Sequence, residues 1–448
     1  MEKLPVPTNN SRVGFHYYPD SVHYRDADIQ HWLPILKNLN CSWLVLNTPQ
    51  DRAIPESFIS TLLSNAIEPV LQFHIDPGSP PIQQDFNMLM DVYANWGVHY
   101  IVLYDRPNMR KSWSPVTWAQ QDLVERFLDR FIPLASSVLQ RGMIPVFPPL
   151  EPGGDYWDTT FLKSALESLN RRGQQSIIDN LVLSAYARVS DKGLNWGAGG
   201  PERWPGAKPY QPTPDNEDQQ GFHIFDWYEA IARTTLEKEI PILLMGVESM
   251  LSAGSEMKSP TSDGQIIRQA QNYVSILQLL NKEKVSEPGS VQKTLDPVPD
   301  PILACNFWVL CADSKSKEIP SAWFKSKGEP SPIVEAVQQW LDHRRTSPKA
   351  PKEHKDVASH PIAHYLLLPT YEWGVSDWHL EVAKPFIKKY APTVGFSIAE
   401  AALALQVTVV GGPQTFSDED LDSLREKGCA VERISGDGTS IASILAER

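Results

Sequence analysis

The sequence predicts an α/β protein, a (β/α)8 TIM barrel followed by a small open α/β (Rossmann-like) domain. Three observations lead to this prediction. Eight short apolar segments alternate with segments of helical periodicity over residues 1–345. A polar, proline-bearing stretch at 346–360 is typical of a linker, and residues 361–448 hold a second series of apolar and amphipathic segments. Near-continuous apolar strands indicate a parallel sheet buried on both faces, and eight successive units without a glycine fingerprint favour closure over an open doubly wound sheet.

The predicted barrel strands are short runs rich in apolar residues. In chain order they cover residues 13–18, 43–46, 69–73, 100–104, 144–147, 181–186, 242–245 and 302–308. The segments between them have the apolar spacing of helices. They are predicted at 29–39, after Pro55, at 86–96, from Ser114, and at 161–169, 225–236, 266–277 and 331–341. At Ser114 and Ser331 a capping residue precedes a proline, which is a typical helix start.

The second domain is predicted as a small open parallel sheet of about 85 residues, which is in the usual range for one compact module. Its strands are expected at 364–368, 393–396, 407–410 and 430–434. Its helices are expected at 378–390, 398–405, 417–427 and 440–446.

The composition excludes several classes of protein. The 448 residues include 41 Lys and Arg against 54 Asp and Glu, so the net charge of −13 argues against a nucleic-acid partner. No apolar run is long enough for a transmembrane helix, and the first residues form no signal peptide, so we expect an extracellular or cell-surface location only if the chain is a mature form. The four cysteines form no CxxC pair, which supports neither a zinc site nor a disulfide scaffold. The 14 tryptophans are about twice the usual number and weakly favour carbohydrate binding.

Polar and aromatic side chains gather where the predicted strands end. Because the active sites of TIM barrels lie at the carboxyl ends of the strands, these side chains are expected to share one face. They comprise carboxylates, amides, histidines and aromatic rings, the groups that bind sugars. They are His16, Asn47, His74, Asp105, Arg106, Asn108, Glu151, Tyr186, Glu248 and Trp308.

Two strand ends carry a family resemblance. The segments Tyr104-Asp105-Arg106-Pro107-Asn108 and Pro241-Ile-Leu-Leu-Met-Gly-Val-Glu248 resemble those of the retaining (β/α)8 glycoside hydrolase clan. In layout the resemblance spans about residues 13–345. In that clan the fourth strand ends in Asn-Glu-Pro-Asn, whose Glu is the acid/base, and the seventh ends in a nucleophilic Glu. The resemblance therefore implies Glu248 as the nucleophile or the main sugar-contacting carboxylate.

The chain departs from the clan at the acid/base position, which holds Arg106. Retaining hydrolysis needs two carboxyl groups about 5–5.5 Å apart, and an arginine with a pKa above about 12 cannot supply the proton. We therefore expect Asp105 or Glu151 to be the proton donor. Two alternatives stay open: Glu248 pairs structurally with Arg106, or chemistry is lost and only sugar binding remains. Glu151 could also merely brace a rigid turn.

The other residues at the strand ends are expected to hold the sugar. These are His16, Asn47, His74, Arg106, Asn108, Tyr186 and Trp308, although the aromatic members could instead serve packing. Neither an HxH nor an HExxH pair is present, so no metal and no cofactor are predicted.

A long loop at 189–224 follows the sixth strand and contains Trp196 and Trp204. Loops of this length in a compact domain are usually functional or disordered, so these aromatics are expected to form a wall or lid over the site. The alternative is a surface loop that buries its own aromatic rings. The segment 249–263, which follows the seventh strand, is a second candidate for the rim of the site.

The C-terminal domain has a resemblance of its own. The segments Val407-Thr-Val-Val-Gly-Gly-Pro413, 416–419, 424–428 and 431–436 resemble a type 2 cell-wall-binding repeat over about 40 residues. That family implies an anionic cell-envelope polymer as a partner, and backbone N–H groups at a Gly411-Gly412 corner can hold an anion. The usual tandem of three repeats is absent, so packing on the barrel is the alternative.

The sequence thus predicts a glycoside hydrolase-like protein that acts on or binds an oligosaccharide or polysaccharide. The alternative is a non-catalytic carbohydrate-binding or cell-surface protein on a degenerate glycosidase barrel, and a metal-dependent hydrolase is a distant third. The sugar, the linkage and the oligomeric state are not predicted.

Overall fold

The chain forms two compact units, residues 1–346 and 347–448. The computed structural model describes residues 4–189, 192–210, 216–248, 263–286, 294–325, 328–346, 362–371, 374–390 and 392–447. Most of the expected linker, 346–360, lies outside these residues, and only its first residue, which ends the last barrel helix, is described. Among the helices that the structure describes, none is both long and apolar enough to cross a membrane.

The first unit is a parallel eight-stranded sheet that closes on itself. The strand order is β5-β4-β3-β2-β1-β10-β7-β6. Isolated parallel bridges from Val146 to Val182 and from Leu150 to Ala185 join the two end strands, β5 and β6. The strands are β1 (Val13–His16), β2 (Trp43–Thr48), β3 (Glu68–Phe73), β4 (Tyr100–Leu103), β5 (Ile144–Val146), β6 (Leu183–Arg188), β7 (Ile242–Glu248) and β10 (Ile302–Phe307). The predicted TIM barrel is confirmed.

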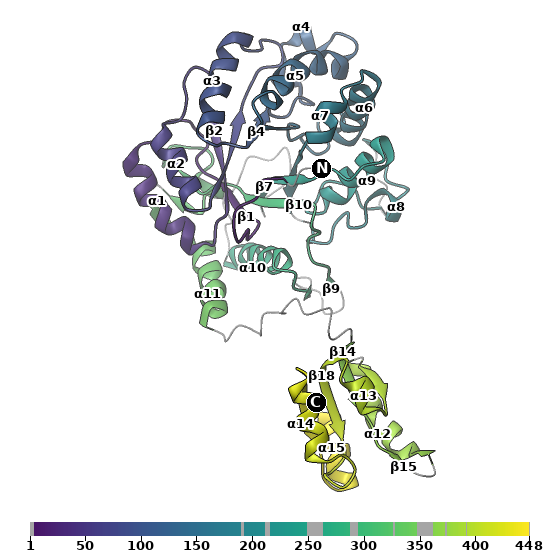
Figure 1. The fold of residues 1–448 in the computed structure, drawn as a ribbon. Coiled ribbons are helices and arrows are strands. Elements are labelled where there is room, and N and C mark those ends of the chain that lie inside the picture. The colour runs from purple at the N-terminus through teal and green to yellow at the C-terminus, as the bar shows by residue number, and fades with distance from the viewer. Residues whose placement is uncertain are drawn as a thin grey trace. The chain divides into compact units, whose positions relative to one another are not determined.

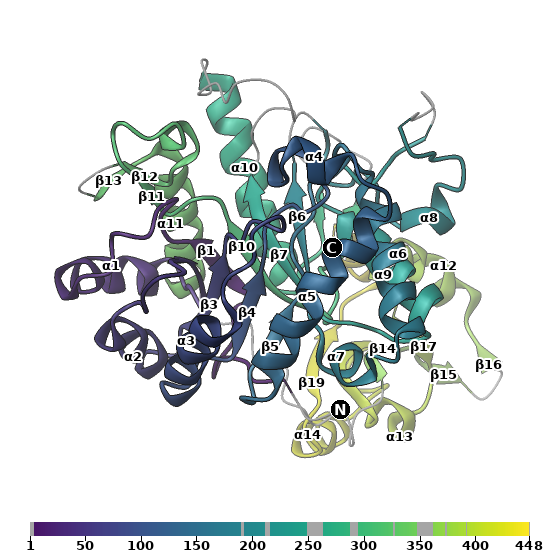
Figure 2. The same cartoon turned by 90° about the horizontal axis from the view of Figure 1, so that it is seen from above.

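Helices surround this sheet, as Figure 2 shows from above. The long ones are α1 (Asp26–Asn38), α2 (Glu56–Ser64), α3 (Gln83–Asn95), α5 (Leu123–Leu139), α6 (Asp158–Arg171), α9 (Ile224–Leu236), α10 (Asp263–Leu280) and α11 (Pro332–Thr346). The short ones are η1 (Arg110–Ser112), α4 (Pro115–Trp118), α7 (Gln175–Asn180), α8 (Gly200–Arg203) and η2 (Ile319–Ser321). Short strands outside the barrel are β8 (Val285–Ser286), β9 (Thr294–Leu295), β11 (Cys311–Ala312), β12 (Phe324–Lys325) and β13 (Glu329–Pro330).

One helix start differs from the prediction. Ser114 does cap a helix, because its side chain accepts a hydrogen bond from the Thr117 N–H, but that helix, α4, ends after four residues. The long helix α5 starts separately at Leu123, after Asp122 has turned the chain with a positive φ of 58°. A left-handed residue cannot continue a right-handed helix, so the segment splits in two.

The core of the barrel has two layers. Strand residues such as Val45, Val70 and Val102 fill the interior, whereas alternate positions such as Leu44 and Leu71 pack under the helices. This double burial explains why the strands have no polar alternation in the sequence. The amino-terminal end of the barrel is covered by the first residues of the chain, because the Tyr100 hydroxyl donates to the Pro5 carbonyl over 2.7 Å.

The second unit is an open four-stranded parallel sheet, shown in yellow-green in Figure 1. Its strands, in the order β17-β14-β18-β19, are β14 (Ile362–Leu367), β17 (Thr393–Gly395), β18 (Ala404–Val410) and β19 (Ala430–Ile434). Its helices are α12 (Asp377–Tyr390), α13 (Ile398–Ala401), α14 (Asp418–Glu426) and α15 (Gly438–Glu447), and a hairpin joins β15 (Thr370–Tyr371) and β16 (Gly374–Val375). Each face of the sheet has its own apolar cluster, so the predicted open α/β domain is confirmed.

The predicted helix at 398–405 is wrong in its second half. Helix α13 ends at Ala401, and Ala404 already belongs to β18. Ala404, Val407 and Val409 are fully buried, and β18 pairs with strands on both sides. Pairing in the centre of the sheet therefore overrides the helical propensity of the alanine- and leucine-rich sequence.

Candidate functional site

The carboxyl ends of three neighbouring strands hold a connected set of charged side chains around one tyrosine. We call this set the mouth network; it consists of Asp105, Arg106, Glu151, Tyr186 and Arg188. The first two follow β4, Glu151 follows β5, and the last two end β6. All but Arg188 were among the predicted site residues, and the barrel brings them together.

The backbone around the network is rigidly held. Arg106 has a positive φ of 47°, and its N–H donates to the Pro149 carbonyl over 2.9 Å. Asn108 is fully buried. Its Oδ1 accepts from the Glu151 N–H, and its Nδ2 donates to the Glu151 carbonyl, both at 2.9 Å. The same Nδ2 also donates to the Tyr156 carbonyl. Asn108 was predicted to contact sugar, but in this arrangement it clamps the loop after β4 to the loop after β5 and so positions Glu151.

Two arginines neutralise the two carboxylates. The Arg106 Nε and Nη2 lie 2.9 and 2.8 Å from Asp105 Oδ2, and its Nη1 lies 3.5 Å from Glu151 Oε2. Arg188 pairs with Glu151 through both guanidinium nitrogens: Nη1 donates to Oε1, and Nη2 donates to Oε2 over 3.1 Å. Bidentate pairs of this kind are among the strongest charge-assisted hydrogen bonds. One guanidinium thus contacts both candidate acids.

The electrostatics favour an ionised Asp105. Burial alone would raise its pKa, but the charges of Arg106 and His74 and the hydrogen bond from Tyr186 outweigh burial and hold the pKa below its ordinary value. A carboxyl group with a lowered pKa is ionised at neutral pH. Asp105 in this arrangement is therefore suited to accept hydrogen bonds and not to donate a proton.

Tyr186 stands at the centre of the network. Its hydroxyl donates to Asp105 Oδ1 over 2.6 Å, and the guanidinium carbons of Arg106 and Arg188 each lie 5.3 Å from its ring centroid. The ring packs against Gly246 of β7, where a Cβ atom would lie 2.8 Å from the ring carbon Cδ1. Gly246 also has a φ of +52°, which favours glycine. Both this backbone conformation and the lack of space for a Cβ atom therefore require glycine at this position.

His16 lies beside this ring and is neutral. Its Nε2 accepts a hydrogen bond from the Gly246 N–H over 3.1 Å, so the ring proton belongs on Nδ1. Burial, with the neighbouring His74, lowers the pKa of His16 to about 3. The edge of the ring meets Trp308 at a centroid distance of 4.7 Å, and the Trp308 indole N–H donates to Glu318 over 3.1 Å.

His74 occupies the open side of Asp105. Its Nδ1 lies 3.6 Å from Asp105 Oδ2, and 45% of its side chain is exposed, against 10% for Asp105. A ligand at the mouth would therefore meet His74 before it met the carboxylate.

Three predicted sugar-binding residues are engaged elsewhere. Asn47 donates to the Pro19 carbonyl over 2.9 Å and joins the loops after β1 and β2. The indole N–H of Trp196 donates to Asp218 over 2.7 Å, and that of Trp204 donates to the Ala198 carbonyl over 3.0 Å. Within the parts of the 189–224 loop that the structure describes, these rings pack on the loop itself, as in the alternative that the sequence left open.

Glu248 ends β7, where its backbone is in register with Arg188 of β6. The register sets it beside the mouth network. Its side chain lies outside the described part of the structure, as does the candidate rim at 249–263 except for Asp263, which begins α10. The role of Glu248 as nucleophile and the alternative pairing with Arg106 both stay predictions.

A buried carboxyl group, that of Asp158, holds the turn that follows Glu151. Asp158, fully buried at the start of α6, accepts from the Gly153 N–H over 2.9 Å, the Gln219 amide over 2.6 Å and the Tyr228 hydroxyl over 3.3 Å. Burial raises its pKa to about 6, although these hydrogen bonds work in the opposite direction. Asp158 thereby ties the turn after Glu151 to the loop and helix that follow β6.

No role was predicted for two residues of the site, Arg188, which the sequence places at the end of the sixth strand, and Gly246. Arg188 follows Tyr186 by two positions on a strand and so shares its face, which is a signal that the sequence contains. Gly246 has no comparable signal, because its contact with Tyr186 crosses two strands that are 60 positions apart in the chain.

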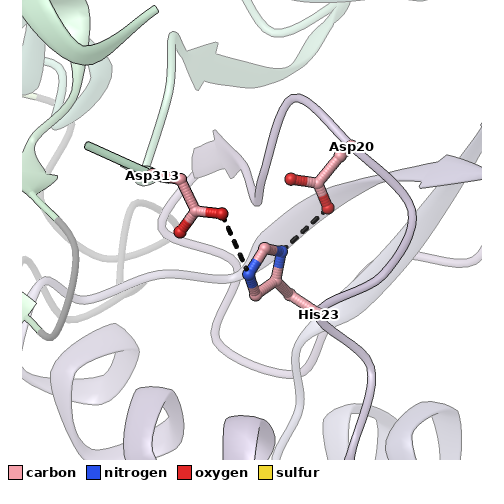
Figure 3. A group of neighbouring side chains, drawn as sticks. All are labelled: Asp20, His23 and Asp313. Atoms are coloured by element: carbon pink, nitrogen blue, oxygen red, sulfur yellow. Dashed lines mark hydrogen bonds and ion pairs between the residues drawn. The ribbon is translucent and has the colours of Figure 1, made fainter. Parts of the chain in front are cut away.

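A separate group of side chains joins the loops after β1 and β11 (Figure 3). His23 Nδ1 lies 2.8 Å from Asp20, its Nε2 lies 3.7 Å from Asp313, and its ring stacks on Tyr18 with centroids 3.9 Å apart. The ligand atoms of the three lie within 4.8 Å of one another, a spacing that a cation could use. Both ring nitrogens already face carboxylates, so we interpret the group as an ion-paired clamp between two loops.

No protein-family model and no curated protein sequence matches this chain. Several solved structures are similar to this chain at low identity and low TM-score. A xylanase 10B from Thermotoga petrophila RKU-1 in complex with xylobiose has 10% identity and a TM-score of 0.43, covering 77% of this chain and 99% of that one. A GH10 xylanase from Bispora sp. MEY-1 has 9% identity and a TM-score of 0.45, with coverage of 74% and 98%. A GH128 endo-β-1,3-glucanase from Sorangium cellulosum has 14% identity and a TM-score of 0.39, with coverage of 72% and 96%. Similarity at this level carries no information about activity, so the function is inferred from the site itself.

Proposed function

We propose that the barrel is a glycoside-hydrolase-like domain that binds an oligosaccharide or polysaccharide at the carboxyl end of its sheet. The observation that carries this proposal is the mouth network, in which buried carboxylates and guanidinium groups surround the ring of Tyr186. Sugar hydroxyls are bound by planar charged groups, and sugar rings lie against aromatic faces. The buried, neutral His16 accepts from the Gly246 N–H next to Tyr186, and Trp308 packs against its ring.

The geometry favours binding over turnover. Hydrolysis with retention needs one carboxyl group that holds a proton at neutral pH. The charge of Arg106 keeps Asp105 ionised, and Glu151 is held by two arginines. We therefore propose a carbohydrate-binding protein on a glycosidase barrel as the first function.

Hydrolysis is the second candidate. It is favoured by the register of β7 against β6, which sets Glu248 next to Arg188, the residue that holds Glu151. Two carboxylates from nearby strand ends would then flank one sugar, with Glu248 as nucleophile and Glu151 as proton donor once a substrate has displaced its arginine partners.

A binding and turnover experiment on the full chain separates these functions. The chain is titrated with a panel of soluble neutral and acidic oligosaccharides, and release of reducing ends is measured in parallel for wild type, Glu248→Gln and Glu151→Gln. Glu56→Gln, an exposed glutamate on α2, is the matched control. Saturable binding without new reducing ends supports the first function. Turnover that only the two mouth variants lose supports the second, and absence of binding to every sugar contradicts both.

We further propose that the C-terminal unit attaches the protein to an anionic cell-envelope polymer, which would require an extracellular or cell-surface location. The support is the sequence resemblance together with a Gly411-Gly412 corner at the end of β18, where Gly411 has a φ of +146°. Co-sedimentation of residues 362–448 with purified cell walls tests this proposal, and equal sedimentation of residues 1–346 would contradict it.

A further inference from the structure

The charges of the mouth network are arranged in two layers. The two carboxylates form the covered layer, since the side chains of Asp105 and Glu151 are each 10% exposed. The cations form the outer layer, since the side chains of Arg188 and Arg106 are 19% and 27% exposed. Among the five residues of the mouth network, the more exposed charges are therefore the positive ones, although the whole chain carries a net charge of −13.

Lys111 adds a third cation to this outer layer. It is exposed and lies in η1, which is held beside the network by the Ser112 hydroxyl on the Arg106 carbonyl at 2.8 Å and by the Arg110 N–H on Asp155 at 2.8 Å. Lys111 forms no ion pair with any residue in the described ranges. Repulsion from Arg106, with some burial, lowers its pKa even though Glu151 and Asp105 act in the opposite direction. The charge of Arg106 is thus close enough to act on the Lys111 ammonium group.

These observations indicate the kind of saccharide that fits. A neutral sugar would leave Lys111 without a counter-charge among the described residues, whereas an anionic group would pair with it and relieve its repulsion from Arg106. Guanidinium and ammonium groups bind carboxylates and sulfates through charge-assisted hydrogen bonds. Resting on the proposed function, we infer that the saccharide is acidic and that its carboxylate or sulfate group binds between Arg106 and Lys111.

The test compares acidic sugars with neutral sugars of the same linkage. Oligomers of galacturonic and glucuronic acid are titrated against the full chain beside their carboxyl-reduced counterparts, and sulfated galactan oligomers beside desulfated ones. We expect the acidic form to bind about 10-fold more tightly, a difference of about 1.4 kcal/mol. This preference should shrink when the salt concentration is raised from about 20 to 200 mM, because the pairing groups are partly exposed.

Substitutions of Lys111 test where the anionic group of the sugar binds. Lys111→Ala should weaken binding of the acidic sugar about threefold, as expected for one exposed charge, and Lys111→Glu should weaken it about 10-fold. Lys37→Ala, an exposed lysine on α1 that is also without an ion-pair partner among the described residues, is the matched control and should change nothing.

The outcomes separate this inference from the proposed function. Equal affinity for acidic and neutral forms, or Lys111 variants that bind like wild type, would overturn the acidic saccharide and leave carbohydrate binding standing. Equal binding of poly-glutamate would also overturn it, because the site would then recognise charge without sugar. Failure of every saccharide to bind would overturn both proposals.

Discussion

Each end of the barrel holds an arginine that is at least partly buried, and the two arginines differ in their contacts. At the amino-terminal end Arg12, 8% exposed, donates to the carbonyls of Leu280, Val298 and Pro299. At the mouth Arg106 pairs with carboxylates and lies over a tyrosine ring. Burial lowers the pKa of Arg12. The surrounding Tyr186, Asp105 and Glu151 raise the pKa of Arg106 in spite of its burial.

The difference agrees with the proposal that the mouth is the end that binds a ligand. Neutral carbonyls satisfy the donors of Arg12 and close the barrel without leaving an exposed charge. At the mouth the guanidinium groups pair with carboxylates, and the two arginine side chains stay partly exposed. The acceptors of the two arginines thus differ in kind, neutral carbonyls for Arg12 and carboxylates for Arg106. The predictions below test this contrast.

The largest effect is expected at the closed end. Arg12→Ala should lower the free energy of unfolding by about 4 kcal/mol, because three buried carbonyls lose their donor and a cavity is left behind. Urea unfolding measures this change, and sugar affinity should be unaffected where the protein is folded. Arg52→Ala is the control, since Arg52 is exposed and makes only long contacts in the described part of the chain, to Asp51 and to the Ser21 carbonyl, each at 3.4 Å. Equal stability of Arg12→Ala and Arg52→Ala would contradict a structural role for Arg12.

The next effect is the pH dependence of stability that Asp158 causes. The folded-state pKa of Asp158 is about 6 against an ordinary 3.8, so the folded chain holds this proton more tightly than the unfolded chain. Its stabilising contribution is complete below about pH 4 and is lost as pH rises through about 6, a change of about 3 kcal/mol.

Asp158→Asn removes this titration. The difference in stability between wild type and this variant, measured by urea unfolding from pH 4 to 8, should therefore move against wild type as pH rises. A difference that stays constant with pH would show that Asp158 does not titrate with a raised pKa.

A smaller loss of stability, with a large loss of binding, is expected at Gly246. A Cβ there would clash with the Tyr186 ring, and the φ of +52° disfavours any side chain. Gly246→Ala should cost about 2 kcal/mol of stability and abolish sugar binding. Gly142→Ala has a similar φ of +73° but nothing within 4 Å of the added methyl group, so it should show the backbone cost of about 1 kcal/mol alone. Similar binding by both variants would contradict the role of Gly246 in holding Tyr186.

The smallest effect is expected for a single hydroxyl group. Tyr186→Phe keeps the ring between the arginines but removes the 2.6 Å hydrogen bond to Asp105. We expect a loss of about 1–2 kcal/mol in stability, with sugar affinity reduced and the fold intact by circular dichroism. Unchanged stability and affinity would mean that Arg106 alone holds Asp105.

Much of this architecture could be predicted because burial on both faces leaves a local signal. The predicted strand at 242–245 contains no alternation, and the predicted strand ends fall within about three residues of the observed ones. The helix predicted at 398–405 shows where local signals fail, since pairing of β18 with two neighbours decides its second half.

The sequence by itself determined the barrel, the second α/β unit and the gathering of Asp105, Arg106, Glu151 and Tyr186 at one end, because strand order and strand ends follow from local periodicity. Only the tertiary structure decided which charges pair. The contacts of Arg188 with Glu151 and of Gly246 with Tyr186 join different strands, and no local pattern encodes the distance between two side chains that meet across a sheet. The physical reason is that an ion pair depends on geometry and burial, which are properties of the folded chain.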